Sequence, residues 1–571
     1  MTPPQVITQP ILPQMDYDAY YREFAWNVPD NFNFAFDVVD YWAKDRTKLA
    51  LLSVNEQGEN PRFQSFYELS RLSSQFAALL AAHGVKKGDR ALLLLQSVPE
   101  WYAAMLGMMK LGVVAMPTTV LVTAKDIAYR LERPQARVVV TDAEHIGRVE
   151  EAIAHSGISM DIKILVGGDK GIPAPGWTPF ENIYQYSARM ERPETSIDDP
   201  MLIYFTSGTT GHPKMALHTH SYAVGHYVTG KYAHGLTTND LHWTVSETGW
   251  AKAGWGKLFG PMMVGAAVFQ REAPGRFDPN MVIRMLERYG ITTFCAPPTV
   301  YRMLVQTDLS AYRRQLNLRR CMSAGEPLNP GVIEQWKQAF NLDIFDHYGQ
   351  SETVAILANC VGMKLKYGSA GLPTPGNDVR VVDEKGKEMA PYEEGTIALY
   401  LGGDRPYGLM REYWKDEDLS AACTHHGYYY TGDRAFRDED GYFWFVGRDD
   451  DVIKSSGYRI GPFEVESALI EHPAVMECAV VGVDDPEGTR GVLVKAFIVL
   501  SEGWQPSAKL TGELQEHVKN TTAPYKYPRL IEYRKELPKT VSGKILRRQL
   551  RLQNMPPAPF PAETGGEARP V

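Results

Sequence analysis

The chain has 571 residues, of which 44% are hydrophobic and 22% charged. A single hydrophobic core stops growing at about 250–300 residues, so this length predicts at least two domains, and the composition excludes a disordered chain. The 60 basic and 68 acidic residues give a formal charge of −8. That balance excludes a surface built to neutralise many nucleic-acid phosphates, and we expect no nucleic-acid partner.

Neither the cysteines nor the apolar runs indicate a secreted or membrane-embedded protein. The five cysteines form no C-x-x-C pair, which favours reduced thiols over a disulfide framework or a structural zinc site. No run approaches the roughly 20 apolar residues of a membrane-spanning helix, and residues 1–29 carry no pattern of a targeting leader. We therefore predict a soluble cytoplasmic protein without a membrane span, either a monomer or a homodimer.

The N-terminal part alternates strand and helix patterns. An apolar strand pattern at residues 91–95 precedes a helical pattern from Pro99 and a second strand pattern at residues 113–116. Similar strand patterns recur at residues 136–141, 162–166, 201–205 and 291–295. This alternation predicts a large α/β domain of several subdomains, with phosphate-handling loops at the ends of strands.

The strongest local motif follows the strand pattern at residues 201–205. It reads Thr-Ser-Gly-Thr-Thr-Gly-His-Pro-Lys from Thr206 to Lys214. Glycines let successive backbone N–H groups surround phosphate oxygens, while the hydroxyls and Lys214 add donors. The spacing is not that of a Walker A loop. Taken alone, the segment is either a nucleotide-phosphate loop or a Gly/Ser/Thr-rich surface turn.

With its preceding Tyr204-Phe205, the motif matches the signature Y/F-T-S-G-[ST]-[ST]-G-x-P-K of the acyl-adenylate-forming (AMP-binding) superfamily. The chain resembles that family from about residue 30 to about residue 550. Met215, where many members have Gly, resembles the medium-chain acyl-CoA synthetases, which are similar to butyrate-CoA ligases. The resemblance implies that ATP is bound by the loop residues Thr206, Ser207, Gly208, Thr209, Thr210, Gly211 and Lys214.

Two further segments, Ser323–Pro327 and Asp346–Thr353, resemble the family's adenine-binding and metal-binding motifs. An aromatic ring such as that of Tyr348 can cover a purine, and a carboxylate such as that of Glu352 suits Mg²⁺. Each motif alone would be weak, because a Tyr-Gly pair is more often a turn. The resemblance assigns nucleotide contacts to Gly325, Glu326, Pro327, Asp346, His347, Tyr348, Gly349, Gln350 and Ser351.

Asp433, in the sequence Tyr-Thr-Gly-Asp, and Arg448 resemble the family's ribose clamp, since a carboxylate accepts hydrogen bonds from both ribose hydroxyls. Asp450, two residues after Arg448, occupies the family's hinge position. The alternatives are an Asx-type turn at Asp433, a surface salt bridge at Arg448 and a solvated acidic turn at Asp450.

The order of predicted helices and strands changes after residue 449. Helical patterns at residues 463–471 and 510–520 alternate with strand patterns at 474–483, 494–500 and 530–534. We predict a smaller α+β domain, and the resemblance implies that it is mobile. The expected division is an N-terminal ATP- and acyl-binding domain over residues 1–449, a C-terminal lid over 450–555 and a flexible tail over 556–571.

The C-terminal part also holds the segments that the resemblance connects with catalysis and with coenzyme A. Lys544 matches the family's adenylation lysine, whose ammonium would stabilise negative charge that develops on the α-phosphate. Together with Glu352 and Thr206 it forms the predicted catalytic set. The resemblance implies coenzyme A contacts at Ser456, Gly457, Tyr458, Arg459, Arg490 and Lys519, although Arg490 and Lys519 have the alternative of being ordinary surface cations.

Two positions in the sequence bear on the size of the acyl pocket. Acetyl-CoA synthetases close their pocket with a Trp where this chain has Gly349, so a longer or bulkier acyl group is expected here. The stretch Ser246–Trp250 resembles the family's acyl-pocket helix, which makes Trp250 either a pocket residue or plain core.

Together these motifs imply an ATP-dependent acyl-CoA synthetase of fatty-acid metabolism. It would convert a medium-chain, branched or aromatic carboxylic acid, ATP and coenzyme A into acyl-CoA, AMP and diphosphate, with Mg²⁺, through an acyl-adenylate. The alternatives are an aryl- or amino-acid-adenylating enzyme that loads a carrier protein, and a catalytically silent nucleotide-binding protein. A hydrolase and a zinc enzyme are disfavoured, because no G-x-S-x-G elbow is present and His425-His426 lacks partner ligands at suitable spacing.

Overall fold

The structure is a computed structural model, and it forms two compact units. The first comprises residues up to Thr431 together with Ala435–Phe445, and the second comprises Gly432–Arg434 and the chain from Val446. Apart from the side chain of Arg459, the structure describes residues 15–167, 175–206, 212–272, 277–309, 312, 316–402, 405–449, 451–455, 458–485, 492–539 and 545–553.

An eight-stranded sheet in the first unit has the order β19-β9-β8-β4-β3-β5-β6-β7. Its strands β3 to β8 run parallel where they pair, whereas β9 is antiparallel to both β8 and β19. The strand bounds are β3 (Arg90–Leu94), β4 (Val114–Pro117), β5 (Val138–Asp142), β6 (Ile162–Val166), β7 (Thr178–Pro179), β8 (Pro200–Thr206), β9 (Lys214–Thr219) and β19 (Glu412–Tyr413).

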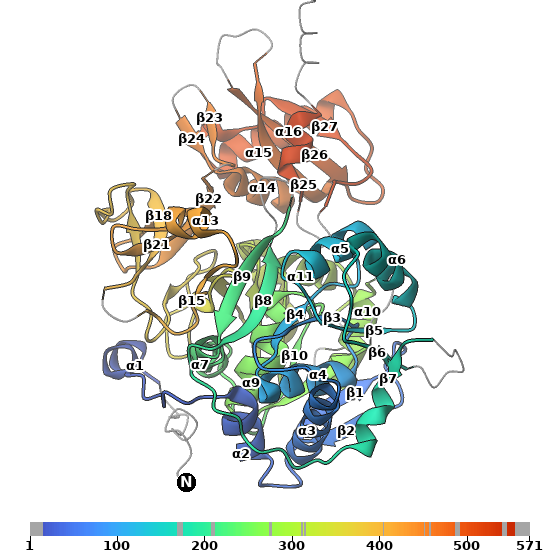
Figure 1. The fold of residues 1–571 in the computed structure, drawn as a ribbon. Helices are drawn as coiled ribbons and strands as arrows, with labels where there is room; N and C mark the ends of the chain where they lie inside the picture. Colours follow the sequence, from blue (N-terminus) through green and yellow to red (C-terminus); the bar gives the residue numbers. More distant parts are fainter. Residues whose placement is uncertain are drawn as a thin grey trace, which may run out of the picture. The chain divides into compact units, whose positions relative to one another are not determined.

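Helices cover both faces of this sheet, as Figure 1 shows. In β3, Ala91 and Leu93 pack into one core with helices α3 (Phe66–Ala82) and α4 (Pro99–Leu111). Leu92 and Leu94 point the other way, into a core with α5 (Ala124–Glu132) and α6 (Ile146–Ser156). Burial on two faces explains why β3 reads as a continuous apolar run rather than an alternating one.

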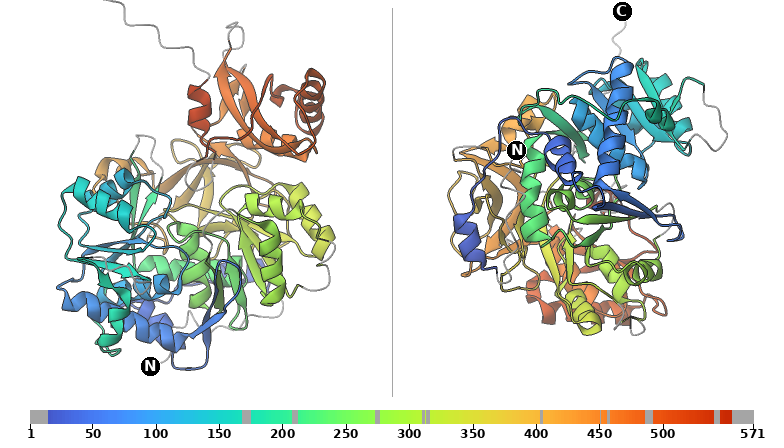
Figure 2. Two further views of the ribbon diagram at one scale, coloured as in Figure 1. Left: turned by 90° about the vertical axis from the view of Figure 1, so that its right-hand side faces the viewer. Right: turned by 90° about the horizontal axis from the view of Figure 1, so that it is seen from below.

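A second, nine-stranded sheet has the order β16-β15-β14-β13-β12-β10-β11-β1-β2. Its inner strands, from β14 to β1, are parallel. Helices α10 (Pro279–Arg288), α11 (Pro298–Val305) and α12 (Pro330–Phe340) pack on it (Figure 2). The bounds are β1 (Leu49–Val54), β2 (Arg62–Ser65), β10 (Leu241–Thr244), β11 (Ala267–Arg271), β12 (Thr293–Ala296), β13 (Arg320–Ala324), β14 (Ile344–Gly349), β15 (Ala355–Ala358) and β16 (Leu372–Pro373).

A five-stranded sheet follows in the chain, in the order β17-β18-β21-β20 with β22 paired to β21. Its bounds are β17 (Val379–Val382), β18 (Gly395–Tyr400), β20 (Thr424–His425), β21 (Tyr428–Arg437) and β22 (Phe443–Arg448).

The second unit is a small α+β domain. Strands β25 (Val475–Asp484), β26 (Val492–Leu500) and β27 (Leu530–Tyr533) form one sheet, and β23 (Ile453–Ser455) pairs with β24 (Tyr458–Ile460). Val480, Ala496 and Ile498 share a core with α14 (Pro462–Glu471) and α15 (Ala508–Thr521). Val481 and Phe497 alternate to the opposite face, where Leu550 of α16 (Arg547–Leu552) packs.

The fold confirms the predicted class, a large α/β domain followed by a smaller α+β domain. The boundary at residue 449 stays a prediction, and residues 554–571 of the expected tail lie outside the described residues. None of the described helices is long and apolar enough to cross a membrane.

Candidate active site

Glu352 is the centre of a hydrogen-bonded cluster in the first unit. It follows β14, is 9% exposed, and its backbone carbonyl accepts a hydrogen bond from Met410 N–H at 2.7 Å. Its Oε1 accepts hydrogen bonds from the Tyr413 hydroxyl at 2.8 Å and from Thr206 Oγ1 at 3.4 Å. Among the described residues both side-chain hydrogen bonds fall on Oε1, so Oε2 is left for a ligand.

The β8–β9 hairpin presents Thr206 and Lys214 to this cluster. The two residues are direct antiparallel partners, so both ends of the glycine-rich loop are fixed next to each other. Lys214 Nζ lies 5.2 Å from the centre of the Tyr413 ring. A hydroxyl, an ammonium and a carboxylate therefore converge at the base of the loop, although residues 207–211 themselves lie outside the described residues.

Tyr413 belongs to this cluster although sequence reasoning missed it. It comes from the two-residue strand β19, which pairs with β9 so that Tyr413 lies opposite Ala216. Burial, and then the neighbouring Glu352 carboxylate, raise the pKa of Tyr413 far above its usual value, so its hydroxyl remains a donor. No periodicity or motif marks this residue, because its position depends on the pairing of an edge strand.

The two predicted adenine-side segments are brought side by side. Ala324 at the end of β13 pairs with His347 in β14, so Gly325–Pro327, which follow β13, and Tyr348–Ser351, at and after the end of β14, lie at the same edge of the sheet. Gly325 has φ +110°, a conformation that favours glycine. Glu326 faces Arg302 at 3.8 Å.

Asp346 and Tyr348 differ in their surroundings. Asp346 is buried and accepts hydrogen bonds from Leu328 N–H and His347 N–H, both at 3.1 Å; burial raises the pKa of its carboxyl to about 7. Tyr348 is only half-buried, and its ring centre lies 6.5 Å from that of Phe445.

Backbone contacts hold Gln350 and Ser351 in place. Gln350 Nε2 donates to the Thr431 carbonyl at 2.9 Å, and the Tyr429 hydroxyl donates to Gln350 Oε1 at 3.2 Å. His218 Nε2 donates to the Ser351 carbonyl at 2.8 Å. This segment is therefore a fixed wall rather than a free turn.

Gly349 lies against Trp255 of the π-helix η6 (Gly254–Phe259). A Cβ at position 349 would stand 2.5 Å from Trp255 Cη2 and 2.2 Å from the Val354 carbonyl oxygen. Trp255 is buried and donates from Nε1 to the Tyr222 hydroxyl at 3.1 Å. The space that the missing side chain at 349 was expected to free is thus partly filled by the Trp255 ring.

The helix expected at Ser246–Trp250 begins instead at Ala251, with Trp250 as an extended residue before α8 (Ala251–Ala253). Gly249 lies close to a neighbouring backbone segment, since a Cβ at this position would stand 2.0 Å from the Thr119 nitrogen. Trp250 is half-buried and donates from Nε1 to Glu247 at 3.1 Å.

The remaining described site residues lie in the second unit. Asp433 is buried in β21, Arg448 is exposed at the end of β22, and neighbouring Arg434 pairs with Asp449 at 3.3 Å. Tyr458 is 52% exposed and stacks on Tyr525 with ring centres 4.2 Å apart.

Lys519 has an acidic neighbour in its own helix. Its Nζ lies 2.6 Å from Glu516 and 4.3 Å from the centre of the Tyr527 ring.

Several predicted residues fall outside the described part of the chain. Lys544 belongs to a segment, residues 540–544, that is bounded by the bridge between Lys539 and Ile545. The side chain of Arg459 is not described. The other predicted residues of this kind are Ser207, Gly208, Thr209, Thr210, Gly211, Asp450, Ser456, Gly457 and Arg490.

Comparison with known proteins shows the family to which this chain belongs. Residues 40–414 match the family model described as AMP-binding enzyme, and residues 464–544 match the model of the AMP-binding enzyme C-terminal domain. The acyl-coenzyme A synthetase ACSM3 of Mus musculus is 44% identical, covering 94% of this chain and 93% of that protein. The acyl-coenzyme A synthetase ACSM4 of Mus musculus is 46% identical, covering 92% and 91%.

Solved structures give the same result. The anthranilate CoA ligase AuaEII with anthranoyl-AMP superposes with a TM-score of 0.83 at 30% identity, covering 92% of this chain and 98% of that one. A benzoate CoA ligase from Burkholderia xenovorans gives 0.79 at 29% identity, covering 91% and 100%. An acyl-CoA synthetase from Brucella canis gives 0.71 at 33% identity, covering 95% and 97%.

The comparisons correct one prediction. The ACSM relatives are named as mitochondrial proteins, which points to the mitochondrion rather than to the cytoplasm that we predicted. Composition and thiol content do not distinguish the cytoplasm from the mitochondrial interior, because thiols are kept reduced in both. The prediction of a cytoplasmic protein was therefore wrong for want of a feature that separates the two compartments.

Proposed function

This chain belongs to the AMP-binding enzyme family, and we propose that it is an AMP-forming acid–thiol ligase that makes acyl-CoA from a carboxylic acid, ATP and coenzyme A. The observation that carries the proposal is the convergence of Thr206, Lys214 and Glu352 at the base of the glycine-rich loop. A phosphate chain would meet a hydroxyl, a cation and a carboxylate there.

A carboxylate is a poor electrophile, so its oxygen must first be replaced by a good leaving group. One oxygen of the acid attacks the α-phosphorus of ATP, the bond to the β-phosphate oxygen breaks, and diphosphate leaves. Lys214 and Thr206 bind phosphate oxygens and fix their direction for this displacement. Lys544 is proposed to stabilise the charge that develops on the α-phosphate.

Magnesium enters this site as part of the Mg-ATP substrate, and the residues present fit it. Glu352 offers an oxygen without a described hydrogen-bond partner, and carboxylate oxygens are preferred Mg²⁺ ligands. The ion supplies charge neutralisation for the triphosphate. Tyr413 holds the Glu352 carboxylate in one orientation by its 2.8 Å hydrogen bond.

Coenzyme A then attacks the acyl carbon through its sulfur, the bond to the AMP oxygen breaks, and the thiol proton leaves with the products. The proposed contacts of coenzyme A lie in the second unit, at Tyr458, Lys519 and the residues around them. The exposed Tyr458–Tyr525 stack and the Lys519 ammonium have the chemistry for a nucleotide base and a phosphate. Asp450 remains the proposed hinge, about which the C-terminal domain would rotate between the two half-reactions.

The acid is proposed to be medium-chain, branched or aromatic. The support for this proposal is the apolar chemistry of the wall, where Gly349 contributes no side chain and the Trp255 ring takes up part of the space beside it. The indole ring of Trp255 and the backbone of Gly349 form a wall that suits an apolar acyl group. In this proposal the Trp255 ring limits the depth of the acyl pocket.

The test is a panel of acids, from butyrate to octanoate, branched acids and benzoate, assayed for AMP release with and without free coenzyme A. We expect release to depend on both the acid and coenzyme A. If AMP is released only when an acyl-carrier protein replaces coenzyme A, the enzyme loads a carrier protein instead. No AMP release under any condition would mean a silent nucleotide-binding protein.

A further inference from the structure

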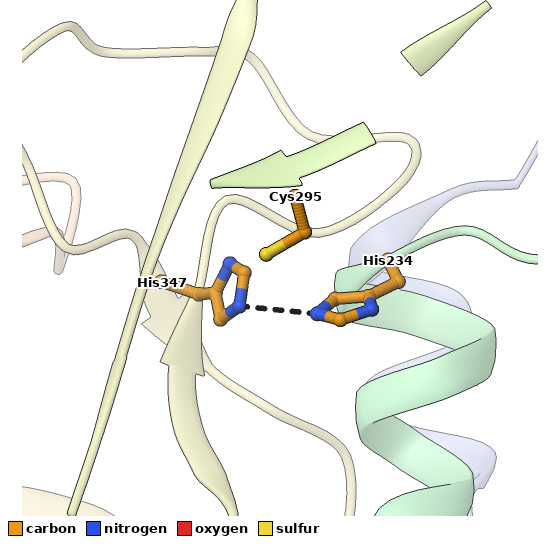
Figure 3. A group of neighbouring side chains, drawn as sticks. All are labelled: His234, Cys295 and His347. Carbon is orange, nitrogen blue, oxygen red and sulfur yellow. Dashed lines mark hydrogen bonds between the residues drawn. The ribbon is translucent and has the colours of Figure 1, made fainter. Parts of the chain in front are cut away.

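Three buried side chains with metal-ligand chemistry meet beside the candidate site. His234 follows the π-helix η5 (Thr229–Ala233), Cys295 lies in β12 and His347 lies in β14. One ligand atom from each lies within 4.8 Å of the other two. Figure 3 shows the two imidazole rings facing each other with the Cys295 sulfur directed toward the space between them.

The distance between the two rings suits a shared ion. His234 Nε2 and His347 Nε2 are 3.2 Å apart. Two imidazole nitrogens bound to one ion at about 2.0–2.1 Å would be about 3.3 Å apart in tetrahedral geometry and about 3.5 Å apart in trigonal geometry. The pair can therefore accept an ion with little movement of either strand or helix.

The ring nitrogens of this histidine pair are incompletely satisfied. The two rings share one hydrogen bond, between His234 Nε2 and His347 Nε2. The Nδ1 atoms of His234 and His347 are both buried and have no hydrogen-bond partner among the described residues.

Neighbouring groups limit which ion fits. His242 is occupied, because its ring nitrogens bond to the hydroxyls of Thr293 and Thr244 at 2.8 Å each. Lys252 and Arg320 place positive charge near both histidines. Asp346, near Cys295, is the described acidic neighbour. This charge pattern favours an ion of low charge that a thiolate can neutralise.

We propose that His234, Cys295 and His347 form a binding site for a thiophilic d¹⁰ metal ion, with Cu(I) favoured over Zn(II). Two imidazoles and one thiolate satisfy the trigonal preference of Cu(I), whereas Zn(II) needs a fourth ligand. On binding, the Cys295 S–H bond breaks, the sulfur–metal bond forms, and one proton is released to solvent. No electron is transferred.

The site touches the acyl wall described above. His347 directly precedes Tyr348 in β14, and its ring centre is 6.4 Å from that of Trp255. An ion that fixes the His347 ring would therefore restrain the same wall that contacts the acid.

The test is anaerobic titration of the full-length, metal-free protein with Cu(I) in competition with bicinchoninate, and separately with Zn(II) in competition with a chromophoric chelator. We expect one tightly held Cu(I) per chain and weaker Zn(II) binding. Cys295→Ser and His234→Gln should each weaken Cu(I) binding at least about 100-fold.

Two controls exclude other sites. Cys321→Ser removes a buried thiol on the neighbouring strand β13, whose side chain packs in the opposite core with Tyr301 and Trp336, and should leave binding unchanged. Replacing both His425 and His426 by Gln removes an exposed histidine pair whose Nδ1 atoms are 3.0 Å apart, and should also change nothing.

X-ray absorption of the copper-loaded wild-type protein gives an answer even if the variants fail to fold. The expected first shell is one sulfur and two imidazole nitrogens. Absence of tight Cu(I) and Zn(II) binding, a first shell without sulfur, or undiminished affinity in folded Cys295→Ser would each overturn the proposal.

Discussion

Glu352 in the first unit and the proposed coenzyme A residues in the second unit are held in opposite ways. In the first unit, Glu352 is 9% exposed and fixed by hydrogen bonds from Tyr413, Thr206 and Met410. In the second unit, Tyr458 is 52% exposed and Lys519 pairs with Glu516 on the surface of its helix. A displacement at phosphorus needs groups fixed before the substrate arrives, whereas capture of a long flexible thiol substrate tolerates exposed, adaptable contacts.

This comparison predicts that formation of the acyl-adenylate is sensitive to changes in the Glu352 cluster. Transfer of the acyl group to coenzyme A should be sensitive to changes at Tyr458 and Lys519. Lys544 is the exception, since it lies in the second unit's segment of the chain but is proposed to serve the first half-reaction.

The largest effect is expected for Lys544→Ala. Loss of the ammonium that is proposed to stabilise charge on the α-phosphate should lower acid-dependent AMP formation by about 10³-fold, or about 4 kcal/mol of barrier. Thioester formation from supplied acyl-AMP should stay close to wild type. A variant with normal diphosphate release from ATP and acid would remove Lys544 from the proposed mechanism.

Glu352→Gln should lower acyl-adenylate formation by about 10²-fold, because the amide cannot neutralise the cation that accompanies ATP. Tyr413→Phe keeps the carboxylate but removes its 2.8 Å hydrogen bond, and should cost about 10-fold. Both are measured by diphosphate release at saturating acid while the Mg²⁺ concentration is varied. Because Glu352→Gln removes a proposed Mg²⁺ ligand, half-maximal activity of this variant should need a higher Mg²⁺ concentration than that of the wild type. An unchanged Mg²⁺ dependence would contradict direct ligation by Glu352.

Trp255→Ala should shift the acid preference by about 10-fold in kcat/KM toward longer or bulkier acids, since it removes the ring that stands against Gly349. Trp250→Ala is the matched comparison, because it removes a half-buried indole that contacts Glu247 instead. Relative kcat/KM values for butyrate, octanoate and benzoate measure the effect. A shift with Trp250→Ala alone would assign the pocket to Trp250, which the sequence left as either a pocket residue or plain core.

The smallest effect is expected for Lys519→Ala, which should raise the KM for coenzyme A about 5-fold, the value of one charge-assisted contact near the surface, with kcat for acyl-adenylate formation unchanged. Lys509→Ala, in the same helix and with a side chain 88% exposed, is the control and should leave the KM unchanged. Equal effects of both variants would show general electrostatic attraction rather than a specific contact.

Sequence patterns predicted those parts of the molecule that are contiguous in the chain. The strand at residues 162–166 was located to the residue, and Thr206, Lys214 and Glu352 were found because each lies inside a continuous motif. The roles proposed for these residues stay predictions.

Features that depend on packing between distant segments were missed. Tyr413 reaches Glu352 only because the short strand β19 pairs with β9, and Trp255 meets Gly349 only because a π-helix approaches the end of β14. His234, Cys295 and His347 show no ligand spacing in the sequence, since three separate elements bring them together. Each of these contacts is set by sheet register and side-chain direction, which one chain's local pattern does not contain.

The most direct test of the central claim is exchange of labelled diphosphate into ATP by the purified protein in the absence of coenzyme A. The account predicts exchange that requires a carboxylic acid and Mg²⁺ and that falls about 10²-fold in Glu352→Gln. Exchange that is absent with every acid offered, or that survives unchanged in Glu352→Gln, would contradict adenylation at the Thr206–Lys214–Glu352 cluster.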